Sequence, residues 1–230
     1  MNRSCARSRP REYGARIAMR RTIQIVRAAA GGYLMGSTPS ADVAARLLTK
    51  GAVDIRSIGT GNPGGTNARR VLGSVPGYGV VVADIAKGTA ACAWGRRCAG
   101  DLGAHTAGVA AVAGHCYPLW ARFRGGKGVA TSFGQCLHTF PAWAPLDFAL
   151  TIAVGRIPGL RRPALVSVLV SSVAWVAASV IWWKRDLPNL WGPRPTAALP
   201  LANAATLLVM SSRGVTMLRR GEPDELALPR

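Results

Sequence analysis

The chain has 230 residues, of which 49% are apolar and 17% charged, and its 29 Lys and Arg residues outnumber 10 Asp and Glu to give a net charge of +19. This apolar content excludes an intrinsically disordered chain, and the shortage of carboxylates counts against a calcium-binding protein. Two classes remain: a basic nucleic-acid-binding protein and a membrane protein with basic loops.

The cysteines and histidines predict no metal centre. The five cysteines are an odd number without close pairs, which argues against a disulfide framework. The chain has no Cys-x-x-Cys motif, and His105, His115 and His138 are not spaced as zinc ligands. We therefore expect neither a metal ion nor another cofactor.

The N-terminal segment 1–21 predicts a basic extension, because it carries seven Arg and one Glu. It is not a secretory signal, since no cleavage site of small residues follows a clean apolar core. We expect translation to start at Met19, which would remove most of this segment.

Six hydrophobic stretches follow, and they identify a membrane protein. The clearest, 164–183, has 20 residues without a charge and ends in Trp182 and Trp183 before two basic residues, as a transmembrane helix does at the bilayer interface. The other stretches are 22–36, 78–95, 104–121, 128–155 and 195–212. No zinc-finger or RNA-recognition signature accompanies them, so we expect no nucleic-acid partner.

The stretch 128–155 has 28 residues, which is too long for one span, and Pro141 and Pro145 interrupt it. It therefore predicts two short helices, 129–140 and 142–155. The resulting fold class is an all-α, polytopic integral membrane protein with about seven transmembrane helices, five at the fewest, and glycine-rich cytoplasmic loops. The membrane domain covers 22–212, and 213–230 forms a cytoplasmic tail.

The positions of Lys and Arg predict the orientation of the chain. Basic residues gather in the loops 37–77, 122–127 and 156–163 and in the tail. With seven spans all four segments lie on one side of the membrane, which should be the cytoplasm, and the N-terminus lies outside. The predicted location is the cell inner (plasma) membrane, which the chain crosses several times.

The first basic loop carries an anion-binding pattern. Gly59, Gly61 and Gly64 match the dinucleotide fingerprint, but no buried strand precedes them, so that interpretation is rejected. Closely spaced glycines instead let the backbone approach an anion. The flanking polar and basic residues add hydrogen-bond donors and cations for phosphate: Arg56, Asn62, Thr66, Asn67 and Arg70.

A second anion-binding pattern lies in the loop before 129. The Gly125-Gly126-Lys127-Gly128 turn leads into a predicted helix, which offers backbone N–H groups, a helix N-terminus and an ammonium group. It is not a Walker loop, because position 128 is Gly where Ser or Thr is required. Two anion sites beside membrane helices indicate a phosphorylated substrate that meets a lipid.

Two charges interrupt the apolar stretch 78–95. Asp84 and Lys87 are three residues apart and share a helix face, so they either pair with each other or serve a function. His115 lies near the end of the next stretch, where a histidine is more often an orienting hydrogen-bonding residue than a catalyst.

These elements, in this order, resemble the bacterial acyl-phosphate-dependent glycerol-3-phosphate acyltransferases, integral membrane enzymes of phospholipid synthesis. The matching motifs cover about 36–135. They are Gly-Ser-Thr-Pro at 36–39, Asp-Ile-Arg at 54–56, Gly-Thr-Gly-Asn-Pro-Gly-Gly-Thr-Asn-Ala-Arg-Arg at 59–70, Asp-Ile-Ala-Lys-Gly at 84–88, Gly-His-Cys-Tyr-Pro at 114–118 and Phe-Arg-Gly-Gly-Lys-Gly-Val-Ala-Thr at 123–131.

The resemblance implies transfer of a fatty acyl group from acyl-phosphate to the 1-hydroxyl of glycerol 3-phosphate, giving lysophosphatidic acid and phosphate. The lipid bilayer is the remaining expected partner. The resemblance makes Ser37, Lys127 and His115 candidate catalytic residues. The residues expected to bind the substrate phosphates are Arg56, Asn62, Thr66, Asn67, Arg70, Gly125, Gly126 and Gly128.

The second half of the chain departs from the family pattern. The family's Arg-Tyr-x-Ser-Leu element reads Arg161-Arg162-Pro163-Ala164-Leu165 here, which replaces the serine by Ala164. In the tail, Ser211 occupies the position of a family histidine and Gly214 that of an asparagine. The alternative function is therefore a catalytically impaired membrane paralogue that binds lipid or a partner.

Overall fold

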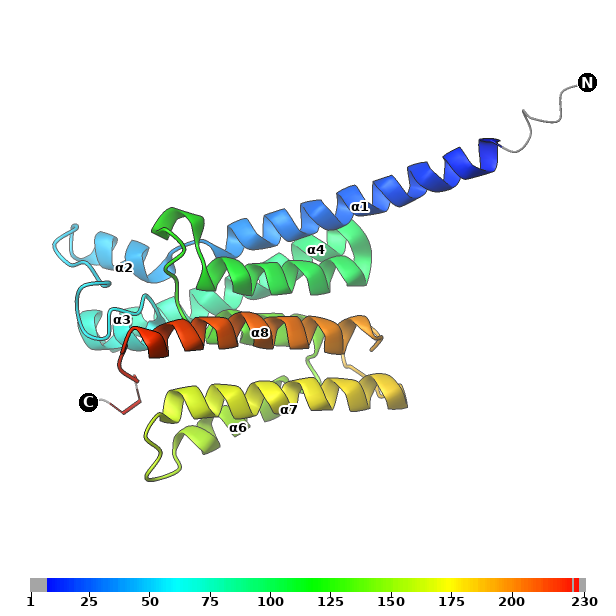
Figure 1. Ribbon diagram of the computed structural model, residues 1–230. Helices are drawn as coiled ribbons and strands as arrows, with labels where there is room; N and C mark the ends of the chain where they lie inside the picture. The colour runs from blue at the N-terminus through cyan, green and yellow to red at the C-terminus, as the bar shows by residue number, and fades with distance from the viewer. Residues whose placement is uncertain (1–7, 225, 228–230) are drawn as a thin grey trace, which may run out of the picture.

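A computed structural model describes residues 8–224 and 226–227 of the chain, and this part is helical without strands (Figure 1). The all-α fold is therefore confirmed. The elements in chain order are α1 (Ser8–Gly36), α2 (Ser40–Leu48), α3 (Gly65–Leu72), α4 (Ser74–Cys116), the 3₁₀ turn η1 (Leu119–Ala121), α5 (Val129–Thr139), α6 (Ala144–Gly155), α7 (Pro163–Arg185) and α8 (Ala198–Arg219).

Helix α4 is two helices joined by a sharp turn. Ala99 and Gly100 leave helical geometry, and Gly100 has φ 63° and ψ −150°, which only glycine adopts readily. The two halves pack so closely that a Cβ on Gly95 would lie 2.1 Å from the Gly103 carbonyl oxygen. These halves correspond to the predicted segments 78–95 and 104–121, and the second half ends at Cys116, before Pro118.

The stretch 128–155 forms two short helices, as the prolines predict. Helix α5 has 11 residues and α6 has 12, with Pro145 in the first turn of α6. At about 1.5 Å per residue each is shorter than the ~30 Å hydrocarbon core of a bilayer. Among the described helices, α7 is the one that is long and apolar enough to cross a membrane by itself.

Small residues bring the helices together. A Cβ added to Gly32 or Gly36 of α1 would lie 2.3 or 1.9 Å from a backbone oxygen of α4, belonging to Ala107 or Ala111. The first half of α4 approaches α5 in the same way, at Gly88 and Gly134. Close backbone approach at small residues is the usual mode of helix packing in membranes, where apolar burial alone gives no driving force.

The predicted basic loops lie at one end of the bundle. Figure 1 places α2, α3, the loop around η1, the α6–α7 connection and the C-terminal segment at this end, which we call the loop end. The first half of α1 extends past the other helices in the opposite direction. Helix α8 continues to Arg219 instead of ending at 212, because the Arg213 charge is paired inside the protein.

Candidate functional site

A cavity of about 310 Å³ opens at the loop end, between α3, α4 and α5 on one side and α6, α7 and α8 on the other. Along α7 its lining extends from Ala164 to Trp175, a distance of about 17 Å at 1.5 Å per residue. The cavity is polar where it meets the loops and mostly apolar deeper in the bundle, so each end suits a different part of a ligand.

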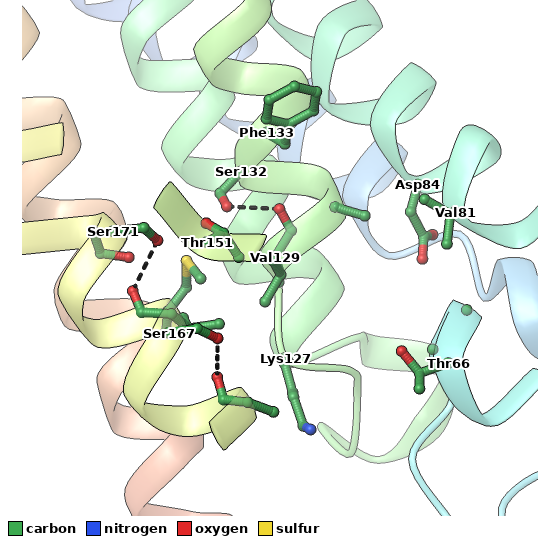
Figure 2. A pocket seen from close by; sticks show the side chains of 18 of the residues that line it. Thr66, Val81, Asp84, Lys127, Val129, Ser132, Phe133, Thr151, Ser167 and Ser171 are labelled. Atoms are coloured by element: carbon green, nitrogen blue, oxygen red, sulfur yellow. Dashed lines mark hydrogen bonds between the residues drawn. The ribbon is translucent and has the colours of Figure 1, made fainter. Parts of the chain in front are cut away.

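Two helix N-termini and a lysine border the polar end. The segment Gly64–Thr66, at the start of α3, and the segment 128–130, at the start of α5, both line the cavity. The first N–H groups of a helix lack partners within the helix, and the helix dipole adds partial positive charge there. Lys127, before α5, and Thr66, in α3, both lie at this end (Figure 2). The arrangement is suited to bind an anion such as phosphate.

The glycine-rich loop before α3 folds around Asn67, whose side chain is fully buried. Its amide oxygen accepts a hydrogen bond from the Thr60 N–H at 2.9 Å, and its amide nitrogen donates to the Ile55 and Ile58 carbonyls at 3.0 Å each. Gly59 has φ 67°, and a Cβ there would lie 2.2 Å from the Asn67 oxygen. Asn67 thus holds the loop in shape, and its amide groups bond to the backbone of that loop.

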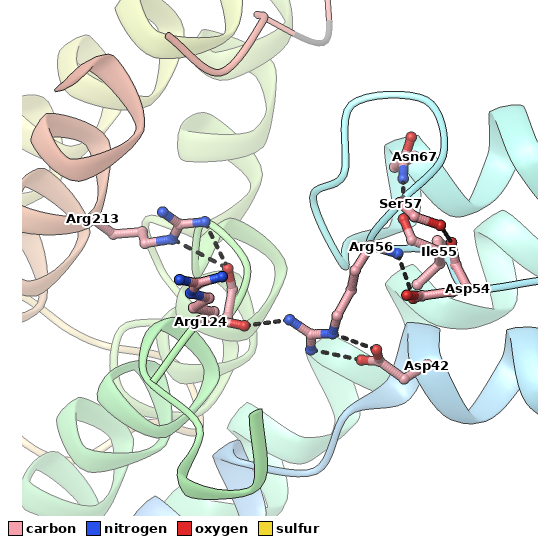
Figure 3. Close-up of polar contacts among 9 residues, drawn as sticks. Asp42, Asp54, Ile55, Arg56, Ser57, Asn67, Arg124 and Arg213 are labelled. Carbon is pink, nitrogen blue, oxygen red and sulfur yellow. Dashed lines mark hydrogen bonds and ion pairs between the residues drawn. The ribbon is translucent and has the colours of Figure 1, made fainter. Parts of the chain in front are cut away.

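Arg56 pairs with Asp42 of α2 through both oxygens of that carboxylate, at 2.5 and 2.8 Å. Its remaining terminal nitrogen donates to the Arg124 carbonyl of the neighbouring loop (Figure 3). Arg56 therefore joins two loops at the loop end. Neither Arg56 nor Arg70, which lies in the last turn of α3, is among the residues that line the cavity.

The Gly-Gly-Lys-Gly turn is fixed to the end of α4. The Gly125 N–H donates to the Cys116 carbonyl at 3.0 Å, and the Gly126 N–H donates to the His115 carbonyl at 3.1 Å. These N–H groups are therefore bonded within the protein, and they fix the turn against the end of α4. Lys127 and Gly128 line the cavity, and Gly128 has φ 87° where the chain turns into α5.

A buried charge network lies behind the polar end. The Asp84 carboxylate accepts hydrogen bonds from the Ser40 hydroxyl and the Lys87 ammonium, both at 2.8 Å. Lys87 also donates to the Thr38 carbonyl at 3.0 Å, which confirms the pairing alternative for these two charges and ties α4 to the chain after α1. The Nδ1 atom of His115 lies 3.7 Å from the same carboxylate, and both side chains reach the cavity.

Ser37 lies beside this network in a small adjoining pocket that it shares with Arg56, Asp84, His115 and Gly126. Ser37 is 1% exposed, and its hydroxyl has no hydrogen-bond partner within the described structure. A buried hydroxyl without a partner is costly, so this group is suited to meet a polar ligand atom. Of the predicted site residues, Asn62, Thr66, His115, Lys127 and Gly128 line the large cavity, and Ser37, Arg56, Gly125 and Gly126 line the small pocket.

The deep end of the cavity is aromatic. Phe133 of α5 and Phe148 of α6 lie against each other, with ring centroids 5.7 Å apart. Trp175 of α7 is 3% exposed and is the last residue of that helix in the lining. The deep end is therefore suited to enclose an alkyl chain.

Serine hydroxyls on the α7 wall do not oppose an alkyl chain. The Ser167 hydroxyl donates to the Ala164 carbonyl and the Ser171 hydroxyl to the Val168 carbonyl, at 3.1 and 3.3 Å (Figure 2). Their polar groups are thereby satisfied within the helix. The Asp147 carboxyl also lines the cavity, next to Phe148 in the first turn of α6, and its Oδ1 atom has no hydrogen-bond partner in the described structure, so this end holds a polar group beside the aromatic rings.

Sequence reasoning missed several residues of this end of the protein. Asp42 holds Arg56, and Arg213 of α8 contacts the Gly125 carbonyl with its Nε and Nη2 atoms, at 3.1 and 2.9 Å. The spacing between Asp42 and Arg56, 14 residues, did not indicate that the two side chains would pair. The signal for Arg213 was its place between the two tail positions that depart from the family pattern.

We expect Gly126→Ala to lower turnover by roughly a hundredfold, because displacing a catalytic loop by about 1 Å has effects of that size. A Cβ on Gly126 would lie 2.3 Å from the His115 Nε2 atom, so the turn or the ring must move. The measurement is turnover per milligram of inserted protein. Gly79→Ala is the control, since a Cβ there meets open space within α4. Equal turnover in both variants would show that the turn tolerates displacement.

The fold and the site together define a class of protein: a polytopic helical membrane protein with a cavity that has two helix N-termini and a lysine at one end and aromatic side chains at the other. The sequence profile of the glycerol-3-phosphate acyltransferase family matches residues 26–218. The chain belongs to this family.

Individual relatives agree with this assignment. A glycerol-3-phosphate acyltransferase of Bacillus cytotoxicus is 42% identical over 150 residues, which cover 65% of this chain and 73% of the relative. One of Symbiobacterium thermophilum is 44% identical over 134 residues, which cover 58% and 64% of the two chains. The crystal structure of PlsY, an integral membrane glycerol 3-phosphate acyltransferase, in its lysophosphatidic acid form superposes with a TM-score of 0.66 at 26% identity and covers 88% of this chain and 93% of its own.

Proposed function

We propose that this protein transfers a fatty acyl group from acyl-phosphate to the 1-hydroxyl of glycerol 3-phosphate. The observation that carries the proposal is the two-ended cavity, in which two helix N-termini and Lys127 border one end and aromatic side chains close the other. An acyl-phosphate has the matching form, an anionic head on an alkyl chain. The family relationship favours this activity over an impaired paralogue.

The reaction needs no covalent enzyme intermediate. Acyl-phosphate is a mixed anhydride, so the 1-hydroxyl oxygen of glycerol 3-phosphate attacks the acyl carbon directly. A new ester C–O bond forms, the bond from the acyl carbon to the phosphate oxygen breaks, and the hydroxyl proton is released. Orientation of the two substrates alone can supply about 7–11 kcal/mol of the barrier.

The proposed roles follow from the positions of the side chains. Lys127 and the N-termini of α3 and α5 hold the phosphate that leaves, with Asn62 and Thr66 beside them. The Ser37 hydroxyl, which lies beside His115 and has no partner in the described structure, contacts a polar atom of glycerol 3-phosphate. His115, with Nδ1 toward Asp84, presents Nε2 as a proton acceptor near Gly126. Arg56 positions the loops around this site through Asp42.

We also propose that the loop end faces the cytoplasm and that the start of α1 lies outside. The support is the gathering of basic loops at that end of the bundle. The inner membrane location and the functional unit 22–212 remain part of this proposal, and the family match begins close to the proposed start of that unit. Residues 1–21 remain a proposed basic extension.

The direct test is acyl transfer by the purified protein in detergent, started at Met19, with palmitoyl-phosphate and glycerol 3-phosphate as substrates. Lysophosphatidic acid and phosphate are measured together, and both should form in equal amounts. Phosphate without lysophosphatidic acid would indicate a different acceptor. Neither product, from a folded and inserted protein, would remove the proposed function.

We expect Trp175→Ala to shift the preference toward longer acyl chains, because Trp175 closes the deep end of the cavity. Each additional methylene buried is worth about 0.8 kcal/mol, or roughly a fourfold change in kcat/KM. The measurement compares kcat/KM for acyl-phosphates of increasing length. Trp191→Ala serves as the control, since Trp191 is 67% exposed in the loop before α8. An unchanged length profile in the Trp175 variant would place the chain end elsewhere.

A further inference from the structure

Arg213 is a buried cation in the C-terminal part of the last helix of the bundle. It lies in α8 and is 4% exposed. Burying an arginine without partners is strongly unfavourable, so its contacts must account for its position. No step of the proposed reaction uses this residue.

Its guanidinium group binds the turn that carries Lys127. The Nε and Nη2 atoms both donate to the Gly125 carbonyl, at 3.1 and 2.9 Å, and Nη2 lies 3.5 Å from the Glu222 carboxylate. Figure 3 shows Arg213 reaching this carbonyl from α8, on the side of the turn away from Arg56. A planar guanidinium offers two parallel donors, which lysine does not.

The same short segment is held from the other side by α4. The Gly125 and Gly126 N–H groups donate to the Cys116 and His115 carbonyls, while Arg213 takes the Gly125 carbonyl. The peptide group between Gly125 and Gly126 is therefore fixed between two helices that are far apart in the sequence. Lys127 follows directly, so its backbone position depends on both anchors.

We propose that Arg213 is a positioning residue for acyl transfer: by holding the Gly125 carbonyl it fixes Lys127 at the mouth of the cavity. The inference rests on the proposed function but concerns a residue that touches neither substrate. Ser211 and Gly214 stand on the same turn of α8, where the family pattern has histidine and asparagine. This turn of α8 therefore lacks the family's histidine and asparagine, and Arg213 provides the contact between α8 and the site.

A chain segment after α8 completes the anchor. Glu222 balances the Arg213 charge, and two residues later both oxygens of Asp224 accept from the Ala164 and Leu165 N–H groups, at 3.2 Å each, at the start of α7. An acidic side chain at a helix N-terminus is stabilising. The segment 222–224 therefore connects Arg213 to the wall of the cavity.

The test compares Arg213→Met and Arg213→Lys with Arg219→Gln, a variant of an exposed arginine in the last turn of α8. The first measurement is amide hydrogen exchange of the segment 122–128, which needs no activity. Exchange should be about tenfold faster in Arg213→Met and unchanged in Arg219→Gln, since the lost anchor lets the turn open locally. Unchanged exchange in Arg213→Met would overturn the proposal.

The second measurement is the KM for palmitoyl-phosphate and the inhibition constant for inorganic phosphate. Both should rise by roughly ten- to a hundredfold in Arg213→Met, with partial recovery in Arg213→Lys, because a displaced Lys127 binds phosphate less well. A merely structural role would lower the amount of active enzyme and leave both constants unchanged, which would also overturn the proposal. If the wild-type protein transfers no acyl group, the proposed function fails while hydrogen exchange still decides the role of Arg213.

Discussion

Lys127→Met should lower turnover to about a hundredth of the wild-type value or less while the protein remains folded and inserted. Removing one group that stabilises developing charge in an enclosed site costs ~10²–10³ in kcat. Lys127 lies at the cavity mouth beside the N-terminus of α5, where the phosphate of the acyl donor would carry away the negative charge. The measurement is the initial rate of lysophosphatidic acid formation.

Lys50→Met is the matched control, since Lys50 is an exposed lysine that follows α2 at the same end of the bundle. The turnover of Lys50→Met should equal that of the wild type. A loss confined to Lys127→Met would then be due to the position of the lysine and not to the change in net charge. Lys127→Arg keeps the charge in a different shape and should recover part of the rate. Full activity in Lys127→Met would remove this lysine from the proposed mechanism.

Asp84→Ala should destabilise the protein by about 3–5 kcal/mol, because removing one partner of a buried ion pair leaves the other charge uncompensated. The Asp84 and Lys87 side chains are 3% and 9% exposed, and Asp84 also holds Ser40 and faces His115. The measurement is denaturant unfolding in detergent. Turnover should fall as well, since Asp84 lines the cavity.

The control for this prediction is Asp101→Ala. Asp101 pairs with Arg96 at the turn within α4, where both side chains are about half exposed, at 51% and 49%. Exposed pairs contribute less than about 1 kcal/mol. In a Lys87→Met background, Asp84→Ala should cost less than it does alone, because both charges are then gone. Equal effects of the Asp84 and Asp101 substitutions would show that the buried network contributes little.

Local chemistry made much of the fold predictable. Three signals are local: charge-free stretches near 20 residues, Pro141 between two short helices with Pro145 in the first turn of the second, and basic residues in alternate loops. The pairing of Asp84 with Lys87 belongs to the same group, because three residues of helix bring the side chains to one face. The end of α8 was misjudged because a charge at 213 reads as the start of a loop unless its distant partners are known.

The site was only partly predictable for a related reason. Glycines at 125 and 126 indicate close backbone approach, and the structure has that approach, but toward His115 and Cys116 instead of a substrate. Asn67 similarly binds the backbone of its own loop. A sequence motif indicates that a polar group or a glycine is required at a position. Which partner needs it depends on how the loop folds back on residues 7 to 12 positions away, which the spacing within the motif does not contain.

The capping of α7 by Asp224 has a consequence for how the protein matures during synthesis. The start of α7 and its acidic cap are 60 residues apart in the chain. At a translation rate of ~5–20 residues per second, the cap is made about 3–12 s after the helix that it completes. When helix α7 is made, its first N–H groups therefore have no bond to Asp224, which is not yet synthesised. Arg213 is likewise made before its partner Glu222. The contacts of the Gly125 carbonyl with Arg213, and of Arg213 with Glu222, therefore form only after the last helix and the acidic segment that follows it have been made.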